Sequence, residues 1–209
     1  MNQTQFQKAA GISAGLAARW YPHITAAMKE FGITSAIDQA MFIAQCGHES
    51  LGFNRVVENF NYSIAGLADF VRYGRLTQDQ ANSLGRSQSE KVLPLERQRA
   101  IANIVYSKRL GNNRATDGWV YRGRGLIQIT GLSNYRDCGS GLKADLVAQP
   151  ELLKQSSYAA RSAAWFYVSK GCLKYPGDLV RITQIINGGQ NGINNRRVRF
   201  LKAKSVLVV

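Results

Sequence analysis

The sequence predicts a mainly α-helical fold with little β-structure, arranged as two lobes around a central cleft. Three observations lead to this fold class. Residues that favour helix N-termini recur in front of apolar helical patterns along most of the chain, and only one stretch is convincingly extended. The segment 64–113 is also more polar and more charged than its flanks, which predicts a small helical lobe beside the main body.

The first helices follow from their capping residues. Residues 4–7 fit a capping box, and Ser13 opens a helical pattern over 13–31 that Gly32 ends. Pro22 within that pattern is expected to break or restart the helix, because proline has no amide hydrogen to donate. Residues 35–38 resemble a second capping box and open a strongly apolar helix.

The same signals predict the later elements. Helices are expected after Ser63, after Thr77 with a capping box to Gln80, and over 90–110, 157–169 and 178–186, with ends at Gly74, Gly111, Gly171 and Asn187-Gly188-Gly189. The one extended stretch is 126–130, which Gly125 and Gly131 bound. We therefore expect a single domain over residues 1–209, with 64–113 as an inserted small helical lobe. A groove between two lobes suits a long polymer better than a closed pocket does.

The composition limits the classes of partner. A formal net charge of +14 predicts attraction to a polyanion, which could be nucleic acid, an anionic membrane surface or a bacterial envelope. The positive residues are dispersed, and no RNA-binding signature or basic helix-turn-helix stands out. A nucleic-acid-binding protein therefore stays an alternative that rests on charge alone. Steep salt dependence of its affinity for DNA would identify it.

The chain carries no signal for a disulfide framework, a metal or an export route. Its three cysteines are an odd number without a CxxC spacing, and it has only two histidines, so we expect neither a disulfide nor a metal or other cofactor. No run of 18 apolar residues is present, and the N-terminus lacks a basic start and an apolar core. We therefore expect the protein to be made and held in the cytoplasm.

Two glutamates nine residues apart are the leading candidate for chemistry. Glu49 ends an apolar helical pattern, so its carboxyl is expected to lie against buried surface, where burial raises a carboxyl pKa and suits a proton donor. Glu58 precedes the polar run 59–63, an exposed context expected to leave it ionised. One protonated and one ionised carboxyl is what sugar cleavage needs. Two ordinary surface glutamates are the alternative.

Two further blocks offer groups that bind ligands. The stretch 121–135 combines glycines with Gln128, Thr130 and Asn134, whose polar groups match those that sugar hydroxyls and N-acetyl groups require. It could equally be a turn beside a strand. In the later stretch 185–200, Asn187 belongs to an Asn-Gly-Gly sequence that reads as a helix C-cap, although its amide could also face a ligand.

Taken in order, three blocks resemble glycoside hydrolase family 19, the chitinase-like fold, and in particular its bacteriophage endolysins. The blocks are His48-Glu49-Ser50, then 121–130 with Asn134-Tyr135, then Ile186-Asn187-Gly188-Gly189. The resemblance covers about residues 36 to 200. It implies a largely helical, two-lobed fold around a cleft, and an inverting, metal-free hydrolysis in which the carboxyls stand about 6.5–9.5 Å apart.

The resemblance also implies roles for single residues. Glu49 looks like the general acid, Glu58 is the candidate general base, and Thr130 matches the hydroxyl that helps to hold the attacking water. The substrate-binding candidates are Tyr121, Gln128, Asn134, Tyr135, Asn187 and Arg197, the last as a late arginine near the acid. His48 is expected to be structural, because no second histidine stands at the spacing of a metal motif.

These features predict an endolysin that hydrolyses β-1,4 bonds in the glycan strands of peptidoglycan. Its positive charge fits electrostatic contact with an anionic envelope, and no nucleic-acid partner and no oligomer beyond a monomer are expected. Such an enzyme would wait in the host cytoplasm until a separate pore-forming protein releases it to the wall. The same features are compatible with a chitinase, with a lytic transglycosylase that uses one glutamate and no water, and with a non-catalytic wall-binding module.

Overall fold

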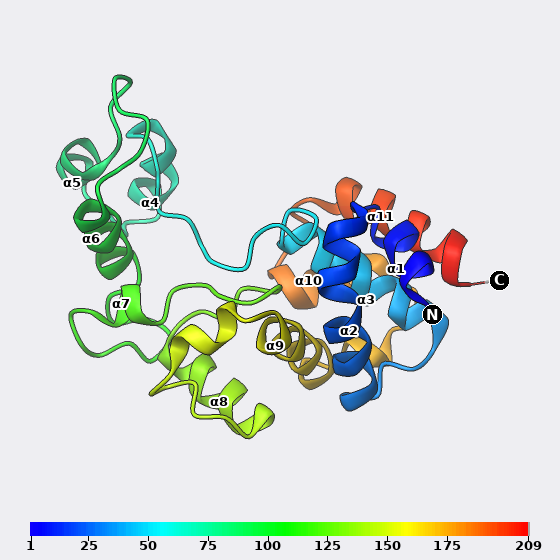
Figure 1. The fold of residues 1–209 in the computed structure, drawn as a ribbon. Helices are drawn as coiled ribbons and strands as arrows, with labels where there is room; N and C mark the ends of the chain where they lie inside the picture. The colour runs from blue at the N-terminus through cyan, green and yellow to red at the C-terminus, as the bar shows by residue number, and fades with distance from the viewer. Residues whose placement is uncertain (209) are drawn as a thin grey trace. The chain divides into compact units, whose positions relative to one another are not determined.

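The computed structural model describes residues 1–208 (Figure 1). The α-helices are α1 (Gln3–Ala10), α2 (Ala14–Glu30), α3 (Ala36–Glu49), α4 (Ala68–Arg72), α5 (Gln78–Leu84), α6 (Leu95–Val105), α7 (Asp117–Val120), α8 (Leu132–Leu142), α9 (Ser156–Ser169), α10 (Leu179–Asn187) and α11 (Ile193–Leu207). Short 3₁₀ helices are η1 (Ala65–Leu67), η2 (Pro150–Lys154) and η3 (Cys172–Lys174). Over residues 1–208 the chain forms no β-strand, so the prediction of a mainly helical fold with little β-structure is confirmed.

The chain divides into two compact units, and each unit is made of more than one segment of the sequence. Unit 1 contains residues 1–56, 124–128 and 138–209, and unit 2 contains residues 57–123 and 129–137. The predicted lobe 64–113 lies wholly within unit 2, which begins earlier and adds a second segment. No helix among residues 1–208 is both long enough and apolar enough to span a lipid bilayer.

Unit 1 is built around α3, which is buried on almost every side. Its residues from Ala40 to Gly47 are buried throughout, as expected of a helix that is apolar all round. Helix α11 packs on α3 and on α1, while α2 packs on α9 (Figure 1). Glu49 is the last residue of α3, so the buried helix in the core of unit 1 fixes the position of its backbone.

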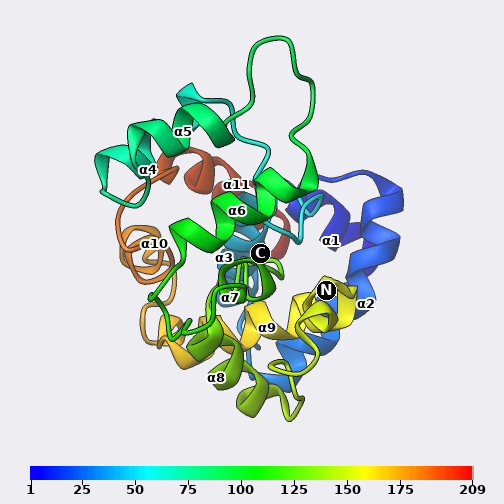
Figure 2. The same ribbon diagram turned by 90° about the vertical axis from the view of Figure 1, so that its left-hand side faces the viewer.

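Unit 2 has its own smaller core around Phe60. This ring is fully buried, and the rings of Tyr62, Tyr106 and Trp119 each lie 6.2 Å from it between centroids. Helix α5 packs on both α4 and α6 (Figure 2). Edge-to-face aromatic contacts of this kind add to the burial of apolar surface.

Most predicted helix starts are confirmed, and two details are corrected. Ser13 caps α2, Ser35 caps α3 and Thr77 caps α5, in each case by accepting a backbone amide hydrogen bond. Helix α1 is capped by Asn2 rather than by the expected Thr4. Pro22 lies inside α2 without ending it, because the carbonyl that loses its partner belongs to an exposed turn where water can hydrate it.

The expected extended stretch 126–130 is wrong, because these residues form turns. Gly125 and Gln128 have positive φ angles of 85° and 32°, which no β-strand adopts. The Gln128 amide Nε2 donates to the Gly125 carbonyl at 3.0 Å and closes the turn. A short apolar run between glycines is ambiguous between a strand and a buried turn.

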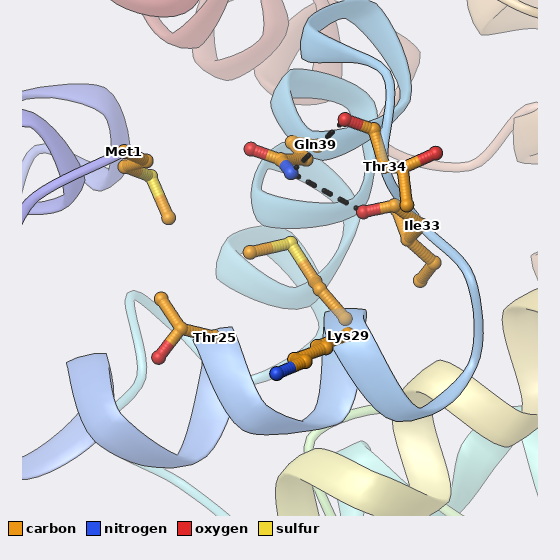
Figure 3. A pocket seen from close by; sticks show the side chains of 7 residues that line it. Met1, Thr25, Lys29, Ile33, Thr34 and Gln39 are labelled. Carbon is orange, nitrogen blue, oxygen red and sulfur yellow. Dashed lines mark hydrogen bonds between the residues drawn. The ribbon is translucent and has the colours of Figure 1, made fainter.

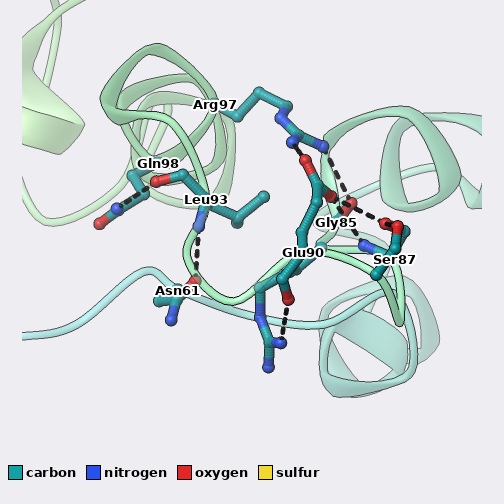
Figure 4. A network of polar contacts seen from close by, with 9 residues as sticks. Asn61, Gly85, Ser87, Glu90, Leu93, Arg97 and Gln98 are labelled. Carbon is teal, nitrogen blue, oxygen red and sulfur yellow. Dashed lines mark hydrogen bonds and ion pairs between the residues drawn. The ribbon is translucent and has the colours of Figure 1, made fainter.

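The predicted helix over 90–110 is shorter than expected. It runs over Leu95–Val105, because Glu90 is used to organise the preceding loop (Figure 4). The Glu90 carboxylate accepts the Ser87 backbone N–H at 2.9 Å and pairs with the Arg97 guanidinium. Asn61 reaches the same loop from outside it, where its Oδ1 accepts the Leu93 backbone N–H at 2.8 Å. These polar contacts replace helical hydrogen bonds before Pro94.

Candidate active site

A tight turn after α3 fixes the position of Glu49. The Ser50 hydroxyl donates to the Cys46 carbonyl at 2.6 Å and accepts the Phe53 backbone N–H at 2.8 Å. Residues 51–53 all have positive φ angles, of 51°, 72° and 64°. Such geometry in non-glycine residues persists only where the surroundings enforce it. The Trp20 indole does so here, because its Nε1 donates to the Phe53 carbonyl at 2.9 Å.

A buried arginine from α11 holds the Glu49 carboxylate. The Arg196 side chain is 1% exposed, and its Nη2 donates to Oε1 of Glu49. Its Nη1 donates to Oε1 of Gln45, and the Gln45 amide in turn reaches the Thr183 hydroxyl at 3.4 Å. The chain Thr183–Gln45–Arg196–Glu49 therefore links three helices of unit 1. A guanidinium buried to this degree needs the carboxylate to offset its lost hydration.

The arginine beside Glu49, the predicted acid, is Arg196 and not the predicted Arg197. Arg197 is exposed on α11, where its Nη1 donates to the Asn194 side chain at 3.1 Å. One residue turns a helix by about 100°, so adjacent arginines face different sides. The expectation of an apolar setting for Glu49 is corrected as well, since its neighbour is a charged guanidinium and its side chain is 21% exposed.

His48 has a structural contact. Its Nδ1 lies 2.9 Å from Oδ1 of Asn195, on α11. The imidazole also lies over Gly192, where an added Cβ would stand 2.2 Å from the ring. Gly192 has a φ of 73°, the left-handed region that glycine adopts without strain.

The contact with His48 predicts that Gly192→Ala is more damaging than Gly188→Ala. Both glycines have a φ of 73°, but a Cβ on Gly188 would meet nothing within 4 Å. We expect Gly188→Ala to lower the free energy of unfolding by about 1 kcal/mol, and Gly192→Ala by about 2–4 kcal/mol, since a steric clash adds to the strain. Urea unfolding of both variants measures the difference. Equal losses would mean that the His48 ring moves aside without cost.

Asn187 and Gln128 are the other predicted site residues in unit 1. Asn187 ends α10, and its amide Nδ2 is buried with no hydrogen-bond partner among residues 1–208. An unpaired buried donor costs about 1–3 kcal/mol, so a partner from outside the chain would be favourable. Gln128 is half-buried and uses its amide nitrogen on Gly125.

Glu58 lies in unit 2, where backbone and side-chain donors surround it. Its Oε1 accepts the Tyr106 hydroxyl at 2.8 Å, and its Oε2 accepts the Gly123 backbone N–H at 3.0 Å. The Glu58 N–H donates back to the Gly123 carbonyl at 2.8 Å. The first glycine of the 121–135 block therefore holds this glutamate, although 65 residues separate the two.

The exposed setting expected for Glu58 is wrong. Burial raises the pKa of Glu58 above its ordinary value of 4.5, and the donors Gly123 and Tyr106, with the Arg122 charge, lower that pKa only in part. The folded state therefore binds this proton more tightly than the unfolded state does. The contribution of Glu58 to stability is largest at acidic pH and falls as the pH rises through the raised pKa.

The remaining predicted residues form one loop and helix start in unit 2. Asn134 donates through Nδ2 to the Thr130 carbonyl at 2.7 Å, and both residues are half-buried. Tyr135 is fully buried, and its hydroxyl donates to the Arg122 carbonyl at 2.7 Å. The Tyr121 ring packs 5.3 Å from that of Tyr135. This burial corrects the expectation that Tyr135 contacts substrate and gives it a supporting role in the loop that carries Thr130.

A hollow of about 260 Å³ in unit 1 lies away from these residues (Figure 3). It is lined by Met1, Thr25, Met28, Lys29, Ile33, Thr34 and Gln39. Gln39 donates to the Ile33 and Thr34 carbonyls at 3.2 and 3.3 Å, as the dashed lines show. None of the predicted site residues lines this hollow, so it is no part of the candidate active site.

Comparison with known proteins decides the family. The model of chitinase class I matches residues 95–197. A glycosyl hydrolase family 19 domain-containing protein of Haemophilus influenzae is 38% identical over 179 residues, covering 84% of this chain and 83% of the relative. The chain belongs to glycoside hydrolase family 19. It is thus a glycosidase, and its substrates as a family member are glycan polymers.

This family 19 enzyme is also similar to chitinases in sequence and in fold. Chitinase 8 of Oryza sativa is 33% identical over 119 residues, covering 43% of this chain and 45% of the relative. The crystal structure of chitinase C from Streptomyces griseus matches with a TM-score of 0.60 at 20% identity, over 99% of this chain and 76% of that one. A bacterial family 19 chitinase matches with a TM-score of 0.56 at 20% identity, over 100% and 95%. The predicted chitinase-like fold is therefore confirmed.

Proposed function

We propose that this family 19 enzyme is an endolysin that hydrolyses β-1,4 bonds between N-acetylmuramic acid and N-acetylglucosamine in peptidoglycan. The observation that carries the substrate class is the net charge of +14. Peptidoglycan bears carboxylates, whereas chitin is neutral, so a strongly cationic enzyme is attracted to the first polymer and gains nothing from the second. Glu49 is the general acid, Glu58 the general base, and the mechanism inverts the anomeric centre.

The contact with Arg196 supports Glu49 as the acid. Arg196 bonds Oε1, which leaves Oε2 to carry the proton toward the glycosidic oxygen. As that proton leaves, negative charge develops on the carboxyl beside a fixed guanidinium. Such a group stabilises the transition state more than the ground state, which is the requirement for catalysis.

The surroundings of Glu58 support its role as the base. The Tyr106 hydroxyl and the Gly123 backbone N–H each donate one hydrogen bond to a different oxygen of Glu58, which stabilises the ionised carboxylate. Each oxygen has a second lone pair that can accept a hydrogen bond from water. Burial makes this carboxylate more basic than an exposed one. A base with a pKa closer to the working pH removes a proton from water more readily. Thr130 is proposed to hold that water, and the unpaired amide of Asn187 to bind an acetamido or hydroxyl group of the glycan.

The Tyr106 hydrogen bond predicts a change in pH dependence. Tyr106→Phe removes a donor that stabilises ionised Glu58, so the pKa of Glu58 rises further. Because the base must be ionised, we expect the acid limb of kcat/KM to move to higher pH, while activity on the alkaline side of that limb changes little. Tyr62→Phe, another tyrosine that packs on Phe60, is the control. If the acid limb does not move, a group other than Glu58 determines it.

Mass spectrometry of the fragments released from purified peptidoglycan tests the proposed reaction. Reducing N-acetylmuramic acid ends are the expected product. Anhydro ends would replace hydrolysis with a transglycosylase reaction, and reducing N-acetylglucosamine ends would move the cut to the other bond. No cleavage of peptidoglycan would overturn the proposed substrate.

A chitinase is the second candidate function. The relatives named Chitinase 8 and Basic endochitinase CHB4 favour it. Incubation of the enzyme with N-acetylglucosamine oligomers beside peptidoglycan distinguishes the two candidates. Cleavage of the oligomers alone would make the enzyme a chitinase.

The endolysin role includes a route to the substrate. We propose that the enzyme accumulates in the host cytoplasm and reaches the wall after a separate pore-forming protein opens the inner membrane. Expression in bacterial cells with and without such a protein tests this route. Rapid lysis that occurs only with both proteins is the expected result, and equal lysis without the pore would overturn it.

A further inference from the structure

Helix α11 exposes an apolar stripe on the side opposite its buried face. Val198 is 67% exposed and Leu201 57%, whereas Arg196 and Phe200 are buried. Val208, directly after the helix, is 37% exposed. At 100° per residue Val198 and Leu201 fall on one side of the helix, and Ser205 lies on the same side. Two largely exposed aliphatic side chains on one side of a helix would gain free energy from burial against an apolar partner.

Cations border this stripe on both edges. By the same helical geometry, Arg197 and Lys204 lie along one edge and Lys202 along the other, and all three are exposed. Helix α11 contains no Asp or Glu. Two apolar side chains with cations on either side offer a bilayer surface both an apolar and an electrostatic contact.

A hollow beside the stripe is lined by two lysines, one from each end of the chain. It has a volume of about 390 Å³ and lies where α11 packs on α1. Its lining comprises Gln7, Lys8, Gly11, Ile12, Lys202, Ser205 and Val206. Its polar lining residues, Gln7, Lys8, Lys202 and Ser205, all carry hydrogen-bond donors, while Ile12 and Val206 are apolar and no carboxylate is present. The two ammonium groups favour an anion such as a phosphate group there.

The sequence around this surface lacks negative charge altogether. Residues 1–29 and residues 179–209 contain neither Asp nor Glu, while they contain nine Lys and Arg residues: Lys8, Arg19, Lys29, Arg181, Arg196, Arg197, Arg199, Lys202 and Lys204. The two ends of the chain meet where α1 packs on α11. Arg196 is buried and paired with Glu49, so the other eight cations carry the positive charge of these two segments, which attracts an anionic partner.

We propose that this surface, formed by Lys8 of α1 with Val198, Leu201, Lys202 and Lys204, docks the enzyme on an anionic phospholipid bilayer. A hydrated polyanion such as peptidoglycan or nucleic acid satisfies the lysines but gives the apolar stripe no burial. A bilayer interface satisfies both, since acyl chains cover the stripe and phosphates meet the lysines. This inference goes beyond the proposed function, because the surface contains none of the three candidate catalytic residues.

The docked orientation leaves Glu49 unobstructed by the helix itself. Arg196 reaches Glu49 from the buried side of α11, while Val198 points away on the other side. The same helix thus completes the surroundings of the acid and faces the membrane. An enzyme held in this way would be concentrated beside the wall that it is proposed to cut.

Vesicle co-sedimentation of the full chain tests the proposal. The probes are vesicles of phosphatidylethanolamine with phosphatidylglycerol, compared with vesicles of phosphatidylcholine. We expect wild type to bind the anionic vesicles at least about tenfold more tightly. Lys202→Gln with Lys204→Gln should weaken that binding by about fivefold for each cation. Val198→Ser with Leu201→Ser should weaken it by about tenfold or more, including at high salt, where the apolar contribution persists.

Matched variants in unit 2 serve as controls. Lys91→Gln with Arg109→Gln lowers the net charge from +14 to +12, as the α11 pair does, and Val92→Ser with Leu95→Ser removes two exposed apolar side chains. Both controls should bind vesicles like wild type. Equal binding to both kinds of vesicle, or equal losses in the controls and the α11 variants, would overturn the proposal.

Activity on lipid-free peptidoglycan separates this proposal from the proposed function. The α11 lysine variant should release sugar fragments at the rate of the Lys91→Gln/Arg109→Gln control, and the α11 apolar variant at the rate of the Val92→Ser/Leu95→Ser control, since no lipid is present. If wild type leaves peptidoglycan intact but binds anionic vesicles, the docking surface stands and the substrate is wrong. If wild type cleaves peptidoglycan and ignores the vesicles, the docking surface is wrong and the substrate stands.

Discussion

Glu49→Gln is expected to abolish turnover while the chain stays folded. A glutamine cannot donate the proton that the leaving sugar needs, and general acid catalysis contributes about 10²–10⁴-fold, so we expect kcat to fall by about 10³-fold or more. The amide oxygen can still accept the Arg196 hydrogen bond, which limits the structural damage. Release of reducing sugar from peptidoglycan measures the loss, and circular dichroism measures the fold.

Glu30→Gln is the matched control for that loss. Glu30 also pairs with an arginine of unit 1, since its two oxygens each accept a bond from Arg161 at 2.7 Å. The control therefore removes an ion-paired carboxylate without touching the candidate site. A Glu49→Gln variant with near wild-type kcat would remove Glu49 from the mechanism.

The second large effect is expected from Glu58→Gln. An inverting hydrolase needs a base to activate water, so removal of this carboxylate should lower kcat by about 10²–10⁴-fold. KM should change little, because a base that acts on water contributes mainly in the transition state. Steady-state kinetics with soluble peptidoglycan fragments separates the two constants.

A transglycosylase makes the opposite prediction for Glu58. It needs one carboxyl and no water, so Glu58→Gln would retain activity and release anhydro sugar ends. Glu96→Gln, an exposed glutamate in the first turn of α6, controls for the lost charge. Small molecular anions such as azide, supplied to Glu58→Gln, should restore part of the rate if the missing group attacks or activates a nucleophile.

The sequence predicted the helix starts well because capping is a local property. Ser13, Ser35 and Thr77 each bond to a backbone amide three residues ahead, so the signal and its effect lie within one turn. Helix α11 was not predicted from the sequence, although it supplies the partner of the acid. Its buried face includes Arg196, and a charged residue at a core position hides the apolar periodicity on which recognition depends.

The sequence marks Glu49 and Glu58 as candidates, and their roles stay predictions, but it did not show their surroundings. Glu49 and Glu58 were judged by their neighbours along the chain, whereas their partners are distant. Arg196 is 147 residues from Glu49, and Tyr106 is 48 residues from Glu58. Those two contacts give Glu49 a charged partner and Glu58 a half-buried hydroxyl donor. The separation of the two carboxyl groups stays a prediction.

The ion pair with Arg196 gives Glu49 a structural reason to be retained in evolution, in addition to its proposed catalytic role. In a mutational scan scored only by protein abundance, changes of Glu49 to apolar residues should be depleted, because they strand a buried guanidinium and lower the folded population. A second change, Arg196→Met, would restore abundance and leave the enzyme inactive. Position 49 would therefore be classed as structural in such a scan, and only an assay of glycan hydrolysis would test its proposed catalytic role.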